Sequence, residues 1–153
     1  MRSALIGLLV LACWLSLDIR TIAQENTAEL RGRVVVMEFW ASWCVACRLT
    51  VPTLNAWKDR YGAQGLTVLG VTTDTPALAM EASVELGIDY PVLSDDDAET
   101  SRAYRAMALP TLFIIDRQGI VRDVMVGYSS ARLAEAEATL RRLVGVGTAP
   151  ASP

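Results

Sequence analysis

Apolar runs rich in β-branched and aromatic residues alternate with amphipathic stretches along most of the chain. Residues 34–40 form an almost uninterrupted apolar run, which is typical of a strand buried on both faces of a parallel sheet, and residues 66–72 predict the next strand. The stretch between them predicts a helix from about Cys44 to Tyr61, kinked by Pro52. Strand, helix and strand of these lengths indicate a parallel pair of strands with a right-handed crossover.

The second half of the chain predicts further helices and a hairpin. Asp74-Thr75-Pro76 provides a cap and a first-turn proline for a helix that ends at Gly87. Asp95-Asp96-Asp97 precedes another helix, and the helix dipole favours anionic side chains there, so we expect a helix terminus and not a metal site. The other expected elements are a strand at 90–93, a helix at 99–107, a hairpin of 111–115 with 120–126, and a last helix capped by Ser129 or Ser130.

Composition excludes several kinds of chemistry. The chain has 153 residues, enough for one domain with its own core, and it contains no histidine. Ser-His-Asp and Cys-His catalysis, histidine-ligated zinc and axial histidine ligation of haem are therefore excluded. Its three cysteines are too few for a tetrahedral zinc site. The net charge is −3 and there is no basic tract, so we expect no nucleic-acid partner, and we expect no cofactor or metal.

The first 23 residues have the pattern of a secretory signal peptide. Arg2 precedes an apolar run at 3–17, and Thr-Ile-Ala ends the segment with small residues at the positions that a signal peptidase requires. The run is shorter than the roughly 20 residues that span a bilayer. We expect cleavage after Ala23. An uncleaved N-terminal membrane anchor is the alternative, because two isoleucines continue the apolar character beyond the run.

The signal segment sets the expected domain boundaries and compartment. We expect a signal peptide or anchor at 1–23, one globular domain at 24–146 and a flexible tail at 147–153. Cys13 falls within the signal segment, so the exported domain keeps two cysteines in an oxidising compartment. The expected location is periplasmic or otherwise extracytoplasmic.

Trp43-Cys44-Val45-Ala46-Cys47 is the pattern that carries chemistry. Two cysteines three positions apart at a helix start can close a disulfide across the first turn. Cys44 would lie near the positive end of the helix dipole, which favours its thiolate and makes it the nucleophile, whereas Cys47 would resolve the mixed disulfide. A lone CxxC also occurs in half-sites for metals, but there is no second CxxC and no histidine here. Val45 and Ala46 add no charge to stabilise the thiolate, which favours a reductant over an oxidant.

With this CxxC and the residues around it, the chain resembles the thioredoxin superfamily, and within it the exported TlpA/ResA/CcmG-type thiol-disulfide reductases. The resemblance covers roughly residues 30–145. The residues that carry it are the CxxC and those around it in the sequence and the expected fold: Gly32-Arg33, Phe39-Trp-Ala-Ser-Trp-Cys44, Pro52, Asp74, Tyr90-Pro91 and Leu109-Pro110-Thr111.

The resemblance implies the fold and the substrate-binding residues. It implies an α/β thioredoxin fold, with a central mixed sheet, helices on both faces and a TlpA-like αβ insertion at 76–93. It also implies that Pro110 is cis and faces the disulfide, and that the backbone of Leu109 pairs with a bound substrate. Trp43 and Thr111 are implied to belong to the same substrate-binding surface.

Glu38 is the main departure from the expected pattern. It interrupts an apolar strand and shares a face with Val36 and Trp40, so we predict a buried general base with a raised pKa that relays a proton for Cys47. The alternative is an outward-facing glutamate without catalytic use. The lysine that partners the corresponding carboxylate in thioredoxin is replaced by Gly70.

A second departure is Thr50, which stands where some TlpA-like reductases carry a glutamate. If Glu38 does the work of that glutamate, the replacement is tolerable; if it does not, we expect slow proton transfer.

The function expected from these features is a protein-disulfide reductase of exported proteins. Its expected partners are exported protein disulfides, with cytochrome c maturation implied by the resemblance, and a membrane electron donor that re-reduces the cysteines; we expect a monomer. A disulfide oxidase or isomerase is the enzymatic alternative, which a midpoint potential above about −150 mV would favour. A non-catalytic docking module for thiol clients is the non-enzymatic alternative. A peroxidase is disfavoured, because Ala41-Ser-Trp-Cys44 lacks the Thr-x-x-Cys site of peroxiredoxins.

Overall fold

The structure, a computed structural model, describes residues 30–145. The expected signal segment at 1–23 and the expected tail at 147–153 lie outside the described residues. Within the described range, none of the helices is long and apolar enough to cross a membrane.

A five-stranded mixed sheet forms the centre of the described fold. Its strands are β1 (Val34–Trp40), β2 (Leu66–Thr72), β3 (Val92–Ser94), β4 (Thr111–Ile115) and β5 (Val121–Val126). They lie in the order β3-β2-β1-β4-β5. β1 and β3 run parallel to β2, whereas β4 runs antiparallel to both β1 and β5. The α/β fold expected for a thioredoxin-like chain is thereby confirmed.

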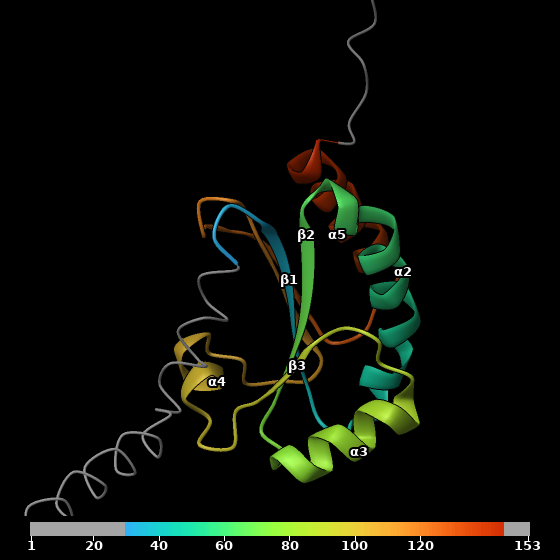
Figure 1. Cartoon of the computed structure of the whole chain (residues 1–153), viewed down its shortest axis with the longest axis vertical. Helices are drawn as coiled ribbons and strands as arrows, with labels where there is room; N and C mark the ends of the chain where they lie inside the picture. The colour runs from blue at the N-terminus through green and yellow to red at the C-terminus, as the bar shows by residue number, and fades with distance from the viewer. Residues whose placement is uncertain (1–29, 146–153) are drawn as a thin grey trace, which may run out of the picture. The chain divides into compact units, whose positions relative to one another are not determined.

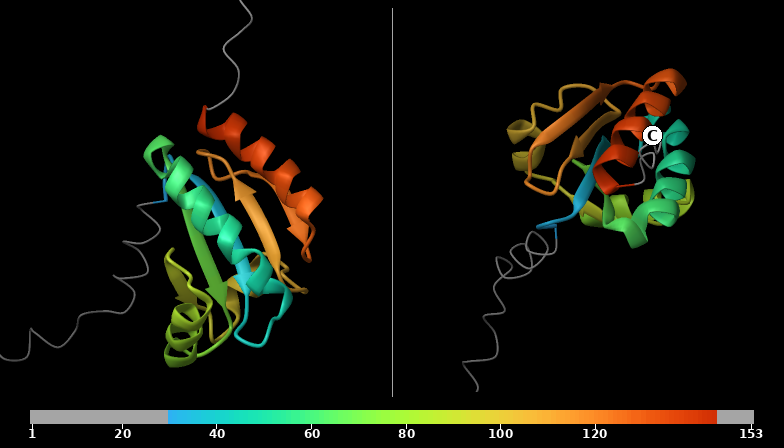
Figure 2. Two further views of the ribbon diagram at one scale, coloured as in Figure 1. Left: turned by 90° about the vertical axis from the view of Figure 1, so that its right-hand side faces the viewer. Right: turned by 90° about the horizontal axis from the view of Figure 1, so that it is seen from above.

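Helices cover both faces of this sheet. The α-helices are α2 (Val51–Tyr61), α3 (Pro76–Leu86), α4 (Glu99–Ala103) and α5 (Ser130–Val144). α2 and α5 lie over one face, whereas α4 lies on the other side of the sheet (Figures 1 and 2). α3 contributes Ala82 to a buried cluster with Trp40 of β1.

The two faces of the sheet are filled by different side chains. Leu54 and Trp57 of α2 and Leu140 of α5 belong to one large buried cluster on the α2/α5 face, which also contains Val36 of β1. Burial of each such side chain stabilises the fold by about 1.5–3 kcal/mol. An aromatic group covers the opposite face, where the rings of Phe39, Tyr104 and Phe113 pack with centroids 5.1–5.6 Å apart.

The expected helix from Cys44 to Tyr61 is wrong in one respect, because the segment forms two separate helices. A 3-10 helix, η2 (Ala46–Leu49), is followed by α2, with Thr50 between them. Pro52 lies in the first turn of α2. Proline has no N–H to bond the carbonyl four residues earlier, and its ring clashes with that carbonyl, which favours a break in the helix at this point.

Two other expected elements have different bounds in the structure. β3 begins at Val92, two residues later than expected, and is only three residues long. α4 ends at Ala103 rather than near Met107, and Arg105 shortly after it has a left-handed backbone with φ of 53°. An α-helix cannot continue through such a residue.

Gly70 of β2 makes room for a large side chain of β1. It is the register partner of Glu38. A Cβ atom at Gly70 would lie 2.8 Å from Nε1 of Trp40 and 3.2 Å from Cγ2 of Val92. The indole of Trp40 therefore fills the space that a side chain at Gly70 would need.

Gly70→Ala is therefore expected to destabilise the protein by about 1–3 kcal/mol, because the added methyl overpacks the buried ring of Trp40. The matched control is Gly62→Ala, since Gly62 has a helical φ of −57° and nothing lies near its Cβ position. The control is expected to be neutral or slightly stabilising. Urea unfolding measures both, and equal stability of the two variants would contradict the packing of Trp40 over Gly70.

Candidate active site

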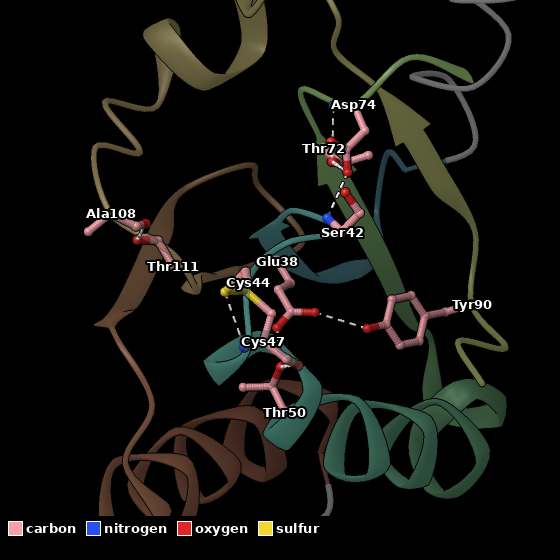
Figure 3. The surroundings of a disulfide bond; sticks show 10 residues. All are labelled: Glu38, Ser42, Cys44, Cys47, Thr50, Thr72, Asp74, Tyr90, Ala108 and Thr111. Atoms are coloured by element: carbon pink, nitrogen blue, oxygen red, sulfur yellow. Dashed lines mark hydrogen bonds between the residues drawn. A yellow bond between two sulfur atoms is a disulfide. The ribbon is translucent and has the colours of Figure 1, made fainter. Parts of the chain in front are cut away.

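Cys44 and Cys47 form a disulfide just beyond the end of β1 (Figure 3). Their Cα atoms are 5.3 Å apart. Cys44 is 5% exposed and Cys47 1% exposed, so the small accessible part of the disulfide is on the Cys44 side. The neighbouring side chains are far more open, at 73% for Trp43 and 76% for Val45. Trp43 and Val45 thus present exposed apolar side chains next to the disulfide in the sequence.

The sulfur of Cys44 lies within hydrogen-bonding distance of a backbone donor. The N–H of Cys47 donates to Sγ of Cys44 at 3.2 Å. After reduction, a donor in this position and the N-terminal end of η2 both favour the thiolate of Cys44 over its thiol. The assignment of Cys44 as the nucleophile stays a prediction, and this geometry favours it.

Asp74 fixes the turn that leads to Cys44. Its Oδ2 accepts hydrogen bonds from the backbone N–H of Ser42 at 2.7 Å and from the hydroxyl of Thr72 at 3.0 Å. The expected helix cap and first-turn proline are Thr75, the N-cap of α3, and Pro76, so the side chain of Asp74 does not occupy the cap position. The carboxylate instead bridges the ends of β1 and β2, which meet at the same edge of a parallel pair.

The loop before β4 contains three of the expected site residues, Leu109, Pro110 and Thr111, of which Pro110 and Thr111 are buried. The peptide bond between Leu109 and Pro110 is cis. The hydroxyl of Thr111 donates to the carbonyl of Ala108 at 2.6 Å, which closes this loop on itself (Figure 3). Leu109 packs against the buried cluster that contains both cysteines.

A pocket of about 250 Å³ lies beside this loop. Trp43 and Leu109 both line it, together with Met107, which is 91% exposed. The pocket thus lies between the loop before β4 and Trp43, and most of the residues that line it are apolar.

Glu38 is completely buried in the middle of β1. One carboxylate oxygen, Oε2, accepts a hydrogen bond from the hydroxyl of Tyr90 at 2.9 Å, and Oε1 contacts the hydroxyl of Thr50 (Figure 3). Burial raises the pKa of Glu38 to about 7, although the hydrogen bonds from Thr50 and Tyr90 act in the opposite direction. The outward-facing alternative for Glu38 is therefore wrong.

Thr50 and Tyr90 are functional candidates that the sequence pattern did not connect to Glu38. In the sequence, Thr50 stands out only as the replacement of a glutamate of TlpA-like reductases, and Tyr90 only as part of the Tyr90-Pro91 pair that carries the family resemblance. Tyr90 is 52 positions away from Glu38 in the chain. The hydroxyl of Thr50 also contacts the carbonyl of Cys47, three residues earlier, which is a common local hydrogen bond for threonine in a helix. This local bond is the part of the Thr50 environment that the sequence alone could have indicated.

The fold and this site define a class of protein: a thioredoxin-fold domain with a CxxC disulfide, a cis-proline loop and a buried carboxyl group. The model of the AhpC/TSA family matches residues 16–124, and the chain belongs to this family.

Individual relatives agree with this assignment. Thiol-disulfide oxidoreductase ResA of Geobacillus kaustophilus is 31% identical over 105 residues, covering 68% of this chain and 60% of the relative. Protein DipZ of Mycobacterium bovis is 33% identical over 113 residues, which are 70% of this chain and 16% of DipZ. A crystal structure from Chlorobium tepidum, provisionally described as thiol:disulfide interchange protein DsbE, superposes with a TM-score of 0.74 at 32% identity, covering 78% of this chain and 85% of that one. The chain spans about 60% of the length of the ResA relative.

The burial of Glu38 predicts an unusual dependence of stability on pH. Its pKa rises from 4.5 to about 7 on folding, so between these values the folded state holds a proton that the unfolded state has lost. The stabilisation is complete below pH 4.5 and is lost as the pH rises through about 7. The expected total loss is about 3 kcal/mol.

Urea unfolding at a series of pH values measures this loss as the difference between the wild type and Glu38→Gln, which cannot ionise at this position. The difference is expected to change in favour of the variant as the pH rises. A constant difference between pH 5 and pH 8 would contradict the raised pKa.

Proposed function

We propose that this protein is a thiol-disulfide oxidoreductase that reduces disulfides of exported proteins through Cys44 and Cys47. The observation that carries the proposal is the disulfide between these cysteines beyond the end of β1, with Leu109 packed against its cluster. The names of the ResA and DsbE relatives support the same chemistry. Since only about 60% of the ResA relative is matched, the activity of the whole protein stays a proposal.

The reaction uses the sulfur atoms of Cys44 and Cys47 and transfers two electrons and two protons to the substrate disulfide. The thiolate of Cys44 attacks one sulfur of a substrate disulfide, which forms a mixed disulfide and releases the first substrate thiolate. The thiolate of Cys47 then attacks Sγ of Cys44, which releases the second substrate thiolate and closes the Cys44–Cys47 disulfide. Two electrons pass to the substrate, and an external dithiol donor must return them before the next cycle.

Trp43, Leu109, Pro110 and Thr111 form the proposed substrate-binding surface. The exposed indole of Trp43 offers a large apolar contact beside the nucleophile. The pocket between Trp43 and Leu109 is lined mainly by apolar groups and is open to an apolar side chain of the substrate. Pro110 and Thr111 belong to the same loop, which the hydrogen bond from the hydroxyl of Thr111 to the carbonyl of Ala108 closes on itself.

Glu38 is the proposed general base for Cys47. A carboxyl group with a pKa of about 7 is present in both protonation states near neutral pH, so it can take a proton from the Cys47 thiol and return one later. Its hydrogen bond partner Thr50 also contacts the Cys47 carbonyl, which places the carboxyl group next to the turn of the resolving cysteine.

The proposed cellular setting rests on the N-terminal sequence pattern and on the residues between the two cysteines. The signal-like pattern at 1–23 supports a periplasmic or other extracytoplasmic location, either as a secreted domain or behind an N-terminal anchor. The neutral Val45 and Ala46 between the cysteines support a reductant rather than an oxidant. A reductant in an oxidising compartment requires a membrane electron donor for its re-reduction, and a single domain with these properties is proposed to act as a monomer without a cofactor.

Reduction of insulin, with dithiothreitol as electron donor, tests the roles of the cysteines. Cys44→Ser is expected to lower the rate to that of dithiothreitol alone, because the nucleophile is lost. Cys47→Ser is expected to accumulate a mixed disulfide with the substrate, visible by mass spectrometry, because the resolving thiol is lost. Equal rates for the wild type and Cys44→Ser would remove the enzymatic proposal.

The pH dependence of the same rate tests Glu38. Glu38→Gln is expected to slow reduction near neutral pH by about 10²-fold and to remove the inflection near pH 7 from the profile. Glu81→Gln on the exposed side of α3 is the control and is expected to behave like the wild type. An unchanged profile in Glu38→Gln would exclude Glu38 from the mechanism.

A further inference from the structure

Thr50 holds a position between Glu38 and the resolving cysteine. It is fully buried at the junction of η2 and α2. Its hydroxyl oxygen contacts Oε1 of Glu38 and lies 2.7 Å from the backbone carbonyl oxygen of Cys47 (Figure 3). The side chain therefore bridges the buried carboxyl group and the backbone of the CxxC turn.

The hydroxyl of Thr50 cannot donate to both neighbours at once. A hydroxyl group has one proton to donate and two lone pairs that accept, whereas an ionised carboxylate and a carbonyl oxygen only accept. When Glu38 is ionised, the hydroxyl of Thr50 donates its hydrogen bond to Oε1 of Glu38. When Glu38 is neutral, its own O–H can donate to Thr50, which frees the hydroxyl proton for the carbonyl of Cys47. In the first arrangement the carbonyl of Cys47 keeps only the backbone N–H of Thr50, at 3.2 Å, and no proton lies between it and the hydroxyl oxygen 2.7 Å away. In the second arrangement the carbonyl gains the hydroxyl as a second donor.

We propose that Thr50 is a positioning residue whose hydroxyl proton changes partner with the protonation state of Glu38, from the carboxylate to the Cys47 carbonyl. The carboxyl group and the backbone of the resolving cysteine are thereby coupled through one side chain. The importance of this coupling for turnover rests on the proposed function, in which Glu38 exchanges a proton with Cys47. The change of partner itself requires only the contacts of Thr50.

The surroundings of Glu38 leave few other groups that could compete with Thr50. Tyr90 donates to the other carboxylate oxygen at 2.9 Å. Across the sheet, Glu38 pairs with Gly70 of β2, which has no side chain, and with the apolar Leu112 of β4. Within residues 30–145, no lysine or arginine forms an ion pair with Glu38.

Two further sets of titratable groups lie near this site. Asp89 precedes Tyr90, and its carboxylate faces Lys58 of α2 at 2.8 Å, so its charge is paired away from the site. Cys44 and Cys47 do not titrate while they form the disulfide. In the oxidised protein the titration of Glu38 is therefore governed by burial and by the hydroxyl groups of Thr50 and Tyr90.

The first test measures the titration of Glu38 in the oxidised protein by ¹³C NMR of its carboxyl carbon. Thr50→Val keeps the branched shape but removes the donor, and is expected to raise the midpoint by about one pH unit, because the carboxylate loses a hydrogen bond. Thr50→Ser keeps the hydroxyl and is the matched control, with a midpoint close to the wild-type value. An unchanged midpoint in Thr50→Val would overturn the proposal.

The second test follows the NMR signal of the carbonyl carbon of Cys47 as a function of pH, first in the wild type and then in the Thr50 variants. In the wild type, its signal is expected to move upfield with the same midpoint as Glu38, because ionisation withdraws the hydroxyl proton of Thr50 from the carbonyl. The step is expected to persist in Thr50→Ser and to vanish in Thr50→Val. A wild-type carbonyl signal that does not titrate with Glu38, or a step that survives in Thr50→Val, would overturn the coupling.

Both tests use the disulfide form without substrate. A failure of insulin reduction would therefore remove the proposed function and leave these titrations to be judged separately. Conversely, an active enzyme with an unaltered titration in Thr50→Val would keep the proposed function and refute the role of Thr50.

Discussion

The position of β1 at the centre of the sheet is the constraint on which the rest of the structure depends. All seven of its residues are buried, between β2 on one side and β4 on the other. The chain must leave such a strand at the edge of the sheet, and Cys44 lies in the turn where it does so. The same burial places Glu38 away from water. A disulfide at the edge of the sheet and a carboxyl group with a raised pKa are thus two consequences of one central strand.

Burial of a carboxyl group is costly unless its oxygens find donors, and the fold supplies them from distant segments. Thr50 comes from the junction where Pro52 prevents a continuous helix, and Tyr90 comes from the segment before β3. Both donors are neutral hydroxyl groups. They lower the pKa of Glu38 less than a cation would, so burial dominates and the value lies near 7. The absence of a side chain at Gly70 serves a different purpose, since the indole of Trp40 occupies that space.

A nearly buried disulfide lies beside very exposed apolar side chains. Cys44 is covered, whereas Trp43, Val45 and Met107 are open to solvent. Exposed apolar side chains gathered near a reactive group are typical of a surface that binds a partner. The hydrogen bonds of Asp74 to Ser42 and of Thr111 to Ala108 hold the two loops that form this surface. Rigid loops reduce the entropy that substrate binding must overcome.

Local sequence determined the elements whose patterns are local: the apolar strands β1, β2 and β4, the helix that begins at Pro76 and ends at Gly87, and the CxxC pair. It also placed Glu38 in a buried strand, because its neighbours at alternate positions are apolar. Only the tertiary structure decided that Asp74 binds Ser42 instead of capping a helix, and that Thr50 and Tyr90 contact Glu38. The physical reason is that propensity and periodicity act over a few residues, whereas the partner of a buried polar group is whatever donor the packing of distant segments brings within about 3 Å.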